Sequence, residues 1–513
     1  MKTLLLLVLV GVVVALVGGQ GLPSLQGRSP SWAIAADPTV PLGQGALALS
    51  RPHPGLTGVH VLNSGRSAFA ARMLLVETAQ RSLDLQYYIW HDDISGQLLL
   101  DAVRRAVERG VRVRLLLDDN GIAGLDPVLA ALQALPQVQV RLYNPFVQRR
   151  FKPLGYLSEP GRLNRRMHNK SFTADGAVSI VGGRNIGDAY FDAAEGVNFA
   201  DLDLLALGAV VGEVATSFDA YWNSESAYPL PLLVKAVPQA SAGQLIEARL
   251  AALGGQAAVD RYRAAVRAST LVHSLQQGTL ALEWVPVELV VDDPQKTLAQ
   301  GDGAVATHML PRLQAAAGTI STRFDVVSPY FVPGDEGTQG FIALAAQGTT
   351  MRVLTNSLAA TDVAAVHAGY ARRRRDLLAA GLSLFELKPD ARAPGPRALT
   401  LGSSSASLHA KTFAIDGERA FVGSFNFDPR SVKFNTEMGF LVKSPALAQS
   451  IHRAFDDALR NTAYVVRLNP AGDLEWVDHG VHPPQVWDSE PKAGLMRRAV
   501  ARMLSWLPIE FLL

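Results

Sequence analysis

Two copies of one polar pattern lie far apart in the sequence, and both combine side chains that can act on a phosphate ester. The first copy reads HNKSFTADGAVSIVGGRN and the second HAKTFAIDGERAFVGSFN, so both keep the spacing His-x-Lys-x4-Asp-x6-Gly-[Gly/Ser]-x-Asn. Their polar members are His168, Lys170, Asp175 and Asn185 in the first copy and His409, Lys411, Asp416 and Asn426 in the second. A single His-x-Lys is most often part of a surface strand, but a duplicated match of this length favours a functional site.

The spacing places the reactive groups of each copy together. Residues two apart on a strand point to the same face, so each His and Lys project side by side. The Asp-Gly dipeptide then turns the chain into a return strand, and the small residues before the Asn permit close backbone approach. This strand brings each Asn back beside its Lys. Asp175 and Asp416 are predicted to belong to the catalytic set, with turn formation as the alternative.

Two such copies around one pocket suit a phosphodiester. One neutral imidazole can attack phosphorus while the other protonates the leaving oxygen, and the roles reverse in a second step. The lysines and asparagines of the motifs would stabilise charge on the equatorial oxygens. Because the lysines supply the positive charge that a metal ion would otherwise provide, we expect neither a metal ion nor another cofactor.

The elements that must position the motifs also occur twice. In the first half, strands are predicted at 82–90, 111–117 and 138–143, with a helix at 96–109. In the second half, the corresponding strands are 323–332, 351–355 and 382–387, with a helix at 340–347. This β-α-β-α-β order predicts a mostly parallel sheet with helices on both faces.

A constant offset relates the two halves. Asp84 and Asp325 are 241 residues apart (325 − 84), and His168 and His409 are also 241 apart (409 − 168). Segments of similar composition would not keep register in this way. We therefore predict an α/β fold of two duplicated α-β-α sandwich units, with the active site at their pseudo-twofold interface.

The whole chain divides into five predicted parts. They are an N-terminal signal peptide or membrane anchor at 1–35, a first repeat at 55–225, a partly helical connector at 226–300, a second repeat at 301–475, and a C-terminal tail with an amphipathic membrane-associating helix at 476–513. The apolar run 4–17 follows Lys2 and is short for a membrane span, which is typical of a signal peptide. Cleavage after Gly19, cleavage after Ala35 and an uncleaved anchor are the alternatives.

Composition limits the classes of function. The chain has 513 residues, of which 48% are hydrophobic and 18% charged, as in a folded protein. A net charge of +2 does not fit a generic binder of polyanions, so any basic surface must be local. The absence of cysteine excludes disulfides, thiolate metal sites and a cysteine nucleophile.

The paired motifs resemble those of the phospholipase D superfamily, over about residues 60–465. The resemblance implies phospholipase D-type units in which His168 is the nucleophile and His409 the acid. It also implies that an acidic residue downstream of each motif supports a histidine, and the matching positions are Asp201 and Glu437. An acid on imidazole Nδ1 would fix the tautomer and leave Nε2 to react. An ordinary carboxylate at a strand edge is the alternative for each.

Longer stretches resemble one branch of that superfamily, the C-type bacterial cardiolipin synthases. Among them are LDLQYYIWHDD (83–93), RLNRRMHNKSF (162–172) and GSFNFDPRS (423–431). This resemblance implies transfer of a phosphatidyl group to phosphatidylglycerol, with phosphatidylethanolamine as donor, through a phosphohistidine. We also expect a location at the bacterial inner membrane, with attachment through the N-terminal segment, the C-terminal tail or both; the side of the membrane is left open by the sequence.

Local composition independently favours a lipid substrate. Between 144 and 170, seven basic residues and a single acid alternate with apolar side chains, which suits an anionic lipid surface. The tail 495–513 also combines arginines with large apolar residues, although a helix packed on the domain is the alternative. The predicted substrate-binding residues are Arg165, Arg166, His367 and Tyr370, and a packing role is the alternative for the last two.

Three other functions remain open from the sequence. A phospholipase D hydrolase would share the first half-reaction, and exclusion of water would decide between hydrolysis and transfer. A nuclease is disfavoured by the near-neutral charge and the membrane signal, so no nucleic acid partner is expected. A lipid-binding protein without activity would not need both motifs complete. The sequence does not identify a helper protein.

Overall fold

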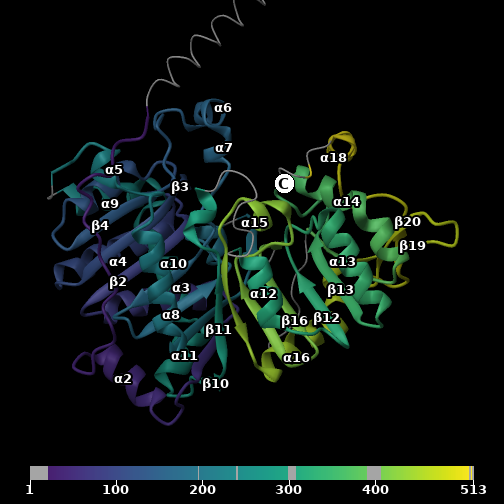
Figure 1. Cartoon of the computed structure of the whole chain (residues 1–513), viewed down its shortest axis with the longest axis horizontal. Coiled ribbons are helices and arrows are strands. Elements are labelled where there is room, and N and C mark those ends of the chain that lie inside the picture. The colour runs from purple at the N-terminus through teal and green to yellow at the C-terminus, as the bar shows by residue number, and fades with distance from the viewer. Residues whose placement is uncertain are drawn as a thin grey trace, which may run out of the picture.

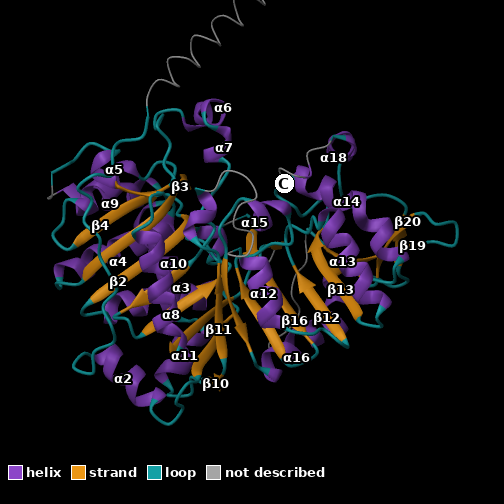
Figure 2. Cartoon of the chain, viewed as in Figure 1, coloured by secondary structure: helices purple, strands orange, loops and turns teal. Residues whose placement is uncertain are grey.

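The computed structural model describes residues 21–194, 196–238, 241–298, 308–389, 406–507 and 510. Over these residues the chain forms two α/β units that lie side by side, each built on one large sheet (Figure 1). Helices cover the sheets (Figure 2). The predicted fold of two duplicated α/β units is confirmed. The predicted N-terminal signal or anchor falls largely on residues 1–20, which lie outside the described residues.

The first unit is built on a sheet of nine strands among the described residues. In spatial order they are β10 (Glu283–Val285), β1 (Thr57–Leu62), β8 (Asp203–Gly208), β6 (Val178–Gly182), β5 (Ser171–Ala174), β2 (Ser82–Ile89), β3 (Arg112–Gly121), β4 (Val138–Tyr143) and β9 (Ala227–Pro229). Only β2, β3 and β4 run parallel to one another, and the other neighbours pair antiparallel.

The second unit repeats this arrangement in a sheet of ten described strands. In spatial order they are β11 (Val287–Val291), β18 (Met438–Val442), β17 (Arg419–Gly423), β16 (Lys411–Ile415), β12 (Arg323–Val327), β13 (Thr350–Asn356), β14 (Ser383–Leu387), β19 (Ala463–Leu468), β20 (Leu474–Asp478) and β21 (Gln485–Trp487). Here only β12, β13 and β14 are parallel. The prediction of a mostly parallel sheet is therefore wrong. Each motif forms a tight hairpin (β5–β6 and β16–β17), and hairpin strands pair antiparallel.

Helices cover both faces of each sheet because alternate side chains of a strand point to opposite faces. In the first unit, α3 (Gly65–Thr78) and α4 (Ile94–Glu108) share a core with Leu115 and Leu117, whereas α8 (Val210–Trp222) packs with Leu116. In the second unit, α12 (Met309–Ala317), α13 (Gly334–Ala346) and α14 (Ala364–Ala379) lie on one face and α16 (Pro445–Arg453) on the other.

The connector and the tail both become part of the units. Helices α9 (Ser241–Ala252), α10 (Gly255–Arg267) and α11 (Thr270–Gln276) of the connector pack on α3 and α4. The connector then adds one edge strand to each sheet, β10 to the first and β11 to the second. The tail forms β21 and α18 (Leu495–Trp506), and α18 packs on α14. Within the described ranges, no helix combines the length and apolarity needed to cross a bilayer.

A buried apolar cluster joins the two units. It contains Val181 and Leu204 of the first unit together with Val422 and Phe440 of the second. Two short parallel strands, β7 (Asn198–Ala200) and β15 (Ala406–Leu408), pair across the same boundary. This packing holds the two motif hairpins face to face.

Candidate active site

The two motif histidines meet at the boundary between the units. His168 precedes β5 and His409 precedes β16, so each stands where its hairpin begins. The backbone N–H of His168 donates to the carbonyl of Thr436 (2.9 Å), and that of His409 donates to the carbonyl of Ala200 (2.8 Å). Each acceptor belongs to the opposite unit. Each unit therefore fixes the backbone of the other unit's motif histidine.

The carboxylates that contact the motif histidines also come from the opposite unit. His168 Nδ1 lies 2.8 Å from Glu437 Oε2, and His409 Nδ1 lies 2.5 Å from Asp201 Oδ2. Thus the acid downstream of one motif binds the histidine of the other motif. A carboxylate that accepts a hydrogen bond from Nδ1–H directs the lone pair to Nε2. Both imidazoles are in this way prepared to react at Nε2.

Burial keeps both imidazoles neutral. Burial, together with the charges of the nearby lysines, outweighs the opposing effect of the carboxylates and lowers the pKa of His168 to about 4 and that of His409 to about 4. Burial alone would raise the pKa of Asp201, but His409 and Lys411 outweigh it and bring that pKa to about 2. The pKa of Glu437 is likewise lowered by His168 and Lys170 despite burial. At neutral pH the pairs are neutral imidazoles beside ionised carboxylates.

The motif lysines are close to the histidines and are destabilised as cations. Each ammonium donates to the backbone carbonyl of its own histidine, and Lys411 Nζ also lies 3.0 Å from His409 Nδ1. Burial lowers the pKa of Lys170 well below its usual range and that of Lys411 to about 8. An anion placed between two such ammonium groups would raise both pKa values. The site therefore favours a negatively charged ligand.

The two asparagines have different surroundings. Asn185 is fully buried; its Oδ1 accepts from the N–H of Ile89 (3.1 Å), and its amide donates to the hydroxyl of Tyr190 (3.1 Å). Asn426 Oδ1, in contrast, is buried without a hydrogen-bond partner among the described residues. Asn185 therefore positions Tyr190, and Asn426 has the carboxamide that is free to orient towards a ligand.

The structure places Asp175 and Asp416 in turns, away from the histidines. Both have positive φ (51° and 53°), and each carboxylate accepts hydrogen bonds from three successive backbone N–H groups at the start of the neighbouring strand. Those strands are β2, next to Asp175, and β12, next to Asp416. Neither carboxylate contacts a motif His or Lys in the described hydrogen bonds. The structure thus favours turn formation over the catalytic role predicted for them.

Aromatic side chains that the sequence did not single out form the walls around the histidines. Tyr88 meets His168 edge-on with ring centroids 5.0 Å apart, and Tyr190 and Phe199 each lie 5.1 Å from His409. The alternation of side chains along β2 could have predicted that Tyr88 lies near the site. It shares a face of β2 with Gln86, which pairs with Ser171 in the motif hairpin.

The two predicted substrate-binding arginines are tied to protein groups. Arg166 is 1% exposed, and its guanidinium binds the carboxylate of Asp118 (2.9 Å) and the carbonyl of Asn144 (2.8 Å). Arg165 is half-buried and donates to the carbonyl of Lys296 (2.9 Å). These contacts favour a role for Arg166 in positioning the segment that leads into His168.

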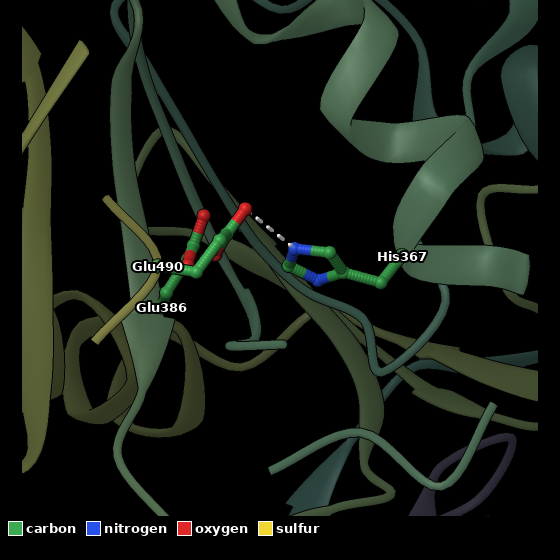
Figure 3. Close-up of side chains that lie close together, drawn as sticks. All are labelled: His367, Glu386 and Glu490. Carbon is green, nitrogen blue, oxygen red and sulfur yellow. Dashed lines mark hydrogen bonds and ion pairs between the residues drawn. The ribbon is translucent and has the colours of Figure 1, made fainter. Parts of the chain in front are cut away.

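His367 and Tyr370 belong to a buried charged cluster beneath α14. Figure 3 shows the ring of His367 pointing towards Glu490, with Glu386 beside it; the His367 Nε2 to Glu490 Oε1 distance is 3.2 Å. The three side chains are close enough to share a cation. Arg374 supplies that positive charge, 2.5 Å from Glu490 and 3.5 Å from Glu386. The packing role is therefore the one that the structure favours for His367 and Tyr370.

Known proteins share the two-unit organisation of this chain. A family model described as "Cardiolipin synthase, PLD-like domain" matches residues 74–222 and 310–459, one match in each unit. Cardiolipin synthase C of Escherichia coli is 46% identical over 477 residues, which cover 92% of this chain and 99% of that protein. A cardiolipin synthase of Oceanobacillus iheyensis is 23% identical over 80% of this chain and 70% of its own length. The crystal structure of phosphatidylserine synthase of Haemophilus influenzae has the same fold, with a TM-score of 0.57 at 13% identity over 91% of this chain and all of that one.

Proposed function

The chain belongs to the family of cardiolipin synthase PLD-like domains, and we propose that it is a phosphatidyltransferase that forms cardiolipin. In this proposal phosphatidylglycerol is the acceptor, phosphatidylethanolamine is the donor, and a phosphohistidine links the two half-reactions. The observation that carries the proposal is the crossed pair of histidine–carboxylate contacts, His168 with Glu437 and His409 with Asp201. It supplies two neutral imidazoles that face one anion-binding site.

The first half-reaction forms the phosphohistidine. Nε2 of His168 attacks the donor phosphorus, and the bond between phosphorus and the ethanolamine oxygen breaks. That oxygen takes a proton from the imidazolium of His409, which forms because the phosphodiester charge beside it raises its pKa. Ethanolamine leaves, and the phosphatidyl group remains on His168. The assignment of attack to His168 follows the family resemblance.

The second half-reaction transfers the group to the acceptor. The now neutral His409 takes the proton of the primary hydroxyl of phosphatidylglycerol, whose oxygen attacks phosphorus. The phosphorus–nitrogen bond to His168 breaks, and cardiolipin is released. Lys170, Lys411 and the carboxamide of Asn426 stabilise the charge on the equatorial oxygens in both steps. The residues themselves supply the charge and the proton transfer that this scheme needs.

Phospholipid substrates imply a location at the bacterial inner membrane. We propose attachment through the N-terminal apolar segment, the C-terminal tail or both. The basic and apolar composition of 144–170 and 495–513 supports contact with anionic lipid.

The test uses the full-length protein with vesicles of phosphatidylglycerol, of phosphatidylethanolamine and of the mixture, and resolves the products by mass. Cardiolipin with one equivalent of free ethanolamine from the mixture is the expected result. Cardiolipin and glycerol from phosphatidylglycerol alone would identify phosphatidylglycerol as the donor. Phosphatidic acid as the main product would make the enzyme a hydrolase and overturn the proposal. His168→Ala and His409→Ala proteins are the controls.

A further inference from the structure

Large apolar side chains are exposed on two separate elements of the structure. Within the described residues, the four most exposed large apolar side chains are Leu495 (83%), Met496 (78%), Trp506 (78%) and Leu157 (65%). Three of them lie on α18, and Leu157 lies on the short helix α6 (Gly155–Ser158). Met503 and Leu507 extend the apolar surface of α18, and Phe151 and Tyr156 that of α6. Exposed apolar groups that gather in this way mark an interaction site.

Both elements lie at one end of the molecule. In Figure 1, α6 and α18 stand at the top, on either side of α15 (Pro429–Lys433). Ser431 of α15 donates to Glu437, the acid that binds His168 (2.8 Å). The two apolar surfaces therefore flank the part of the structure that contains the catalytic residues.

A short chain of contacts leads from α6 to the first histidine. The hydroxyl of Tyr156 donates to Asn120 Oδ1 (3.0 Å), and the Asn120 amide donates to the hydroxyl of Tyr88 (3.2 Å). The ring of Tyr88 in turn contacts His168. Only two side chains separate the exposed helix from the proposed nucleophile.

A comparable path leads from α18 to the second motif. Arg497 of α18 donates to the carbonyl of Thr361. The next residue, Asp362, accepts a hydrogen bond from Tyr330 (2.8 Å), and its charge raises the pKa of Lys411 against the effect of burial. Each apolar surface is thus connected to one half of the site.

We propose that α6 and α18 form a two-part docking surface for an anionic phospholipid bilayer, with the active site opening between its two parts. This inference rests on the proposed function, since the bilayer would supply both substrates at that opening. The chemistry of the surface supports this occupant: α18 contains three arginines and no acid, and Arg150 beside α6 is exposed. Gly21 also lines a cavity with Phe146, whose ring contacts Tyr156 of α6, and the apolar run 4–17 precedes Gly21 in sequence.

The absence of cysteine permits a direct test in the full-length protein. Single cysteines replace Leu157, Met503 or, as a matched control, Leu275, which is 43% exposed on α11 at the opposite end of the molecule (Figure 1). Each variant is made in the His168→Ala protein and labelled with an environment-sensitive fluorophore. Vesicles of phosphatidylglycerol and phosphatidylethanolamine should shift the emission to the blue at 157 and 503, but not at 275. Brominated lipids should quench the first two labels only.

Other outcomes would overturn the inference. Labels at 157 and 503 that stay in water while the protein binds vesicles would leave the N-terminal segment as the attachment. A blue shift without vesicles that grows with protein concentration would make this surface an interface between copies of the chain. A blue shift that depends neither on vesicles nor on protein concentration would mean that the N-terminal segment covers this surface. Because the His168→Ala protein does not turn over, cardiolipin synthesis is tested separately and its failure would leave the docking result intact.

A second measurement uses charge. The double variant Leu157→Asp with Met503→Asp should lower the rate on vesicles about tenfold or more, because aspartate opposes insertion into an anionic interface. The loss should be smaller when the same lipids are dispersed in detergent. The matched double variant Leu49→Asp with Leu275→Asp, on α2 (Pro41–Ser50) and α11, should keep the normal rate on vesicles. Equal losses in the two double variants would contradict a docking role for α6 and α18.

Discussion

The two copies of the motif share one backbone frame, but the carboxylates that hold their histidines are supported differently. Glu437, which binds His168, accepts hydrogen bonds from the hydroxyls of Ser424 (2.5 Å) and Ser431 (2.8 Å). Asp201, which binds His409, has Gly183 at the position that corresponds to Ser424. A Cβ at Gly183 would meet the Asp201 carboxylate at 2.2 Å. The shorter acid is therefore paired with the smaller neighbour, and the longer acid with the serine.

This difference gives the two histidines different surroundings. Two hydroxyl donors fix both oxygens of Glu437, so His168 is held in one tautomer, as a nucleophile requires. Asp201 accepts instead from the backbone N–H of Leu202 (2.7 Å), and Lys411 lies within 3.0 Å of His409 Nδ1. A histidine beside both an acid and an ammonium suits a group whose proton is exchanged in each half-reaction. The comparison thus agrees with attack by His168.

Removal of either histidine gives the largest expected effect. His168→Ala or His409→Ala should lower kcat with phospholipids by at least about 10⁴-fold, because each removes a reacting group. A donor with a nitrophenol leaving group separates the two roles, since its departure needs no acid. With it, His409→Ala should still release one equivalent of nitrophenol in a burst, whereas His168→Ala should release none. Rapid-mixing absorbance checks this, and the reverse pattern would assign attack to His409.

The acids should have the next largest effect. Glu437→Gln and Asp201→Asn should each lower kcat by about 10²- to 10⁴-fold, because an amide can present N–H to Nδ1 and so stabilise the wrong tautomer. With the nitrophenol donor, the burst rate should fall much more in Glu437→Gln than in Asp201→Asn. Thermal unfolding of both variants should stay close to that of the unaltered protein. Equal burst rates would show that the two acids do not divide their roles between attack and protonation.

Local spacing explains why the motifs and their hairpins could be predicted. The His-x-Lys face, the Asp-Gly turn and the 241-residue offset all depend on residues near one another in the chain. The crossed pairing of acids and histidines could not be read in this way. It arises from the packing of the units, through β7 with β15 and through the bridge between Met167 and Thr436.

The protein partners of the predicted substrate-binding residues could not be read from the sequence for a similar reason. Arg166 lies in a basic stretch of the sequence that is typical of an exposed surface. Its partner, Asp118, is 48 residues away on strand β3. Likewise, Arg374 is neutralised by Glu490, 116 residues further along the chain. Composition indicates that charges are present, but only the fold shows which are already paired.

Anion affinity should distinguish the two lysines by its dependence on pH. Lys411, with a pKa of about 8, must be protonated to bind an anion, so affinity for sulfate should fall about tenfold per pH unit above that value. Asp201, Glu437, Asp362 and Asp428 are the charged groups that raise this pKa against burial. In Lys411→Arg the fall should become less steep because arginine remains charged, and only the contribution of Lys170, whose pKa burial also lowers, should be left. Titration calorimetry at several pH values measures the affinity, and a fall that is equally steep in Lys411→Arg but absent in Lys170→Arg would identify Lys170 as the titrating group.

The smallest expected effect concerns the turn aspartates. Asp175→Ala and Asp416→Ala should each lower the free energy of unfolding by about 1–3 kcal/mol, because backbone N–H groups lose their acceptor. The loss should be greater for Asp175, which is fully buried, than for Asp416, whose partners Ser321 and Thr322 are exposed. Urea unfolding measures both.

The contribution of Asp416 should also depend on pH with a definite sign. Burial raises the pKa of Asp416, but hydrogen bonds from the backbone N–H groups of Arg323, Thr322 and Ser321 outweigh it and hold that pKa below its usual range. Its stabilising contribution is therefore complete above the unfolded pKa of about 3.9 and is lost as the pH falls through the lower folded value. The difference in stability between the unaltered protein and Asp416→Ala should shrink over that acidic range. Turnover per folded molecule should change less than about tenfold in both variants, and a loss comparable to that of the histidine variants would return Asp175 or Asp416 to the catalytic set.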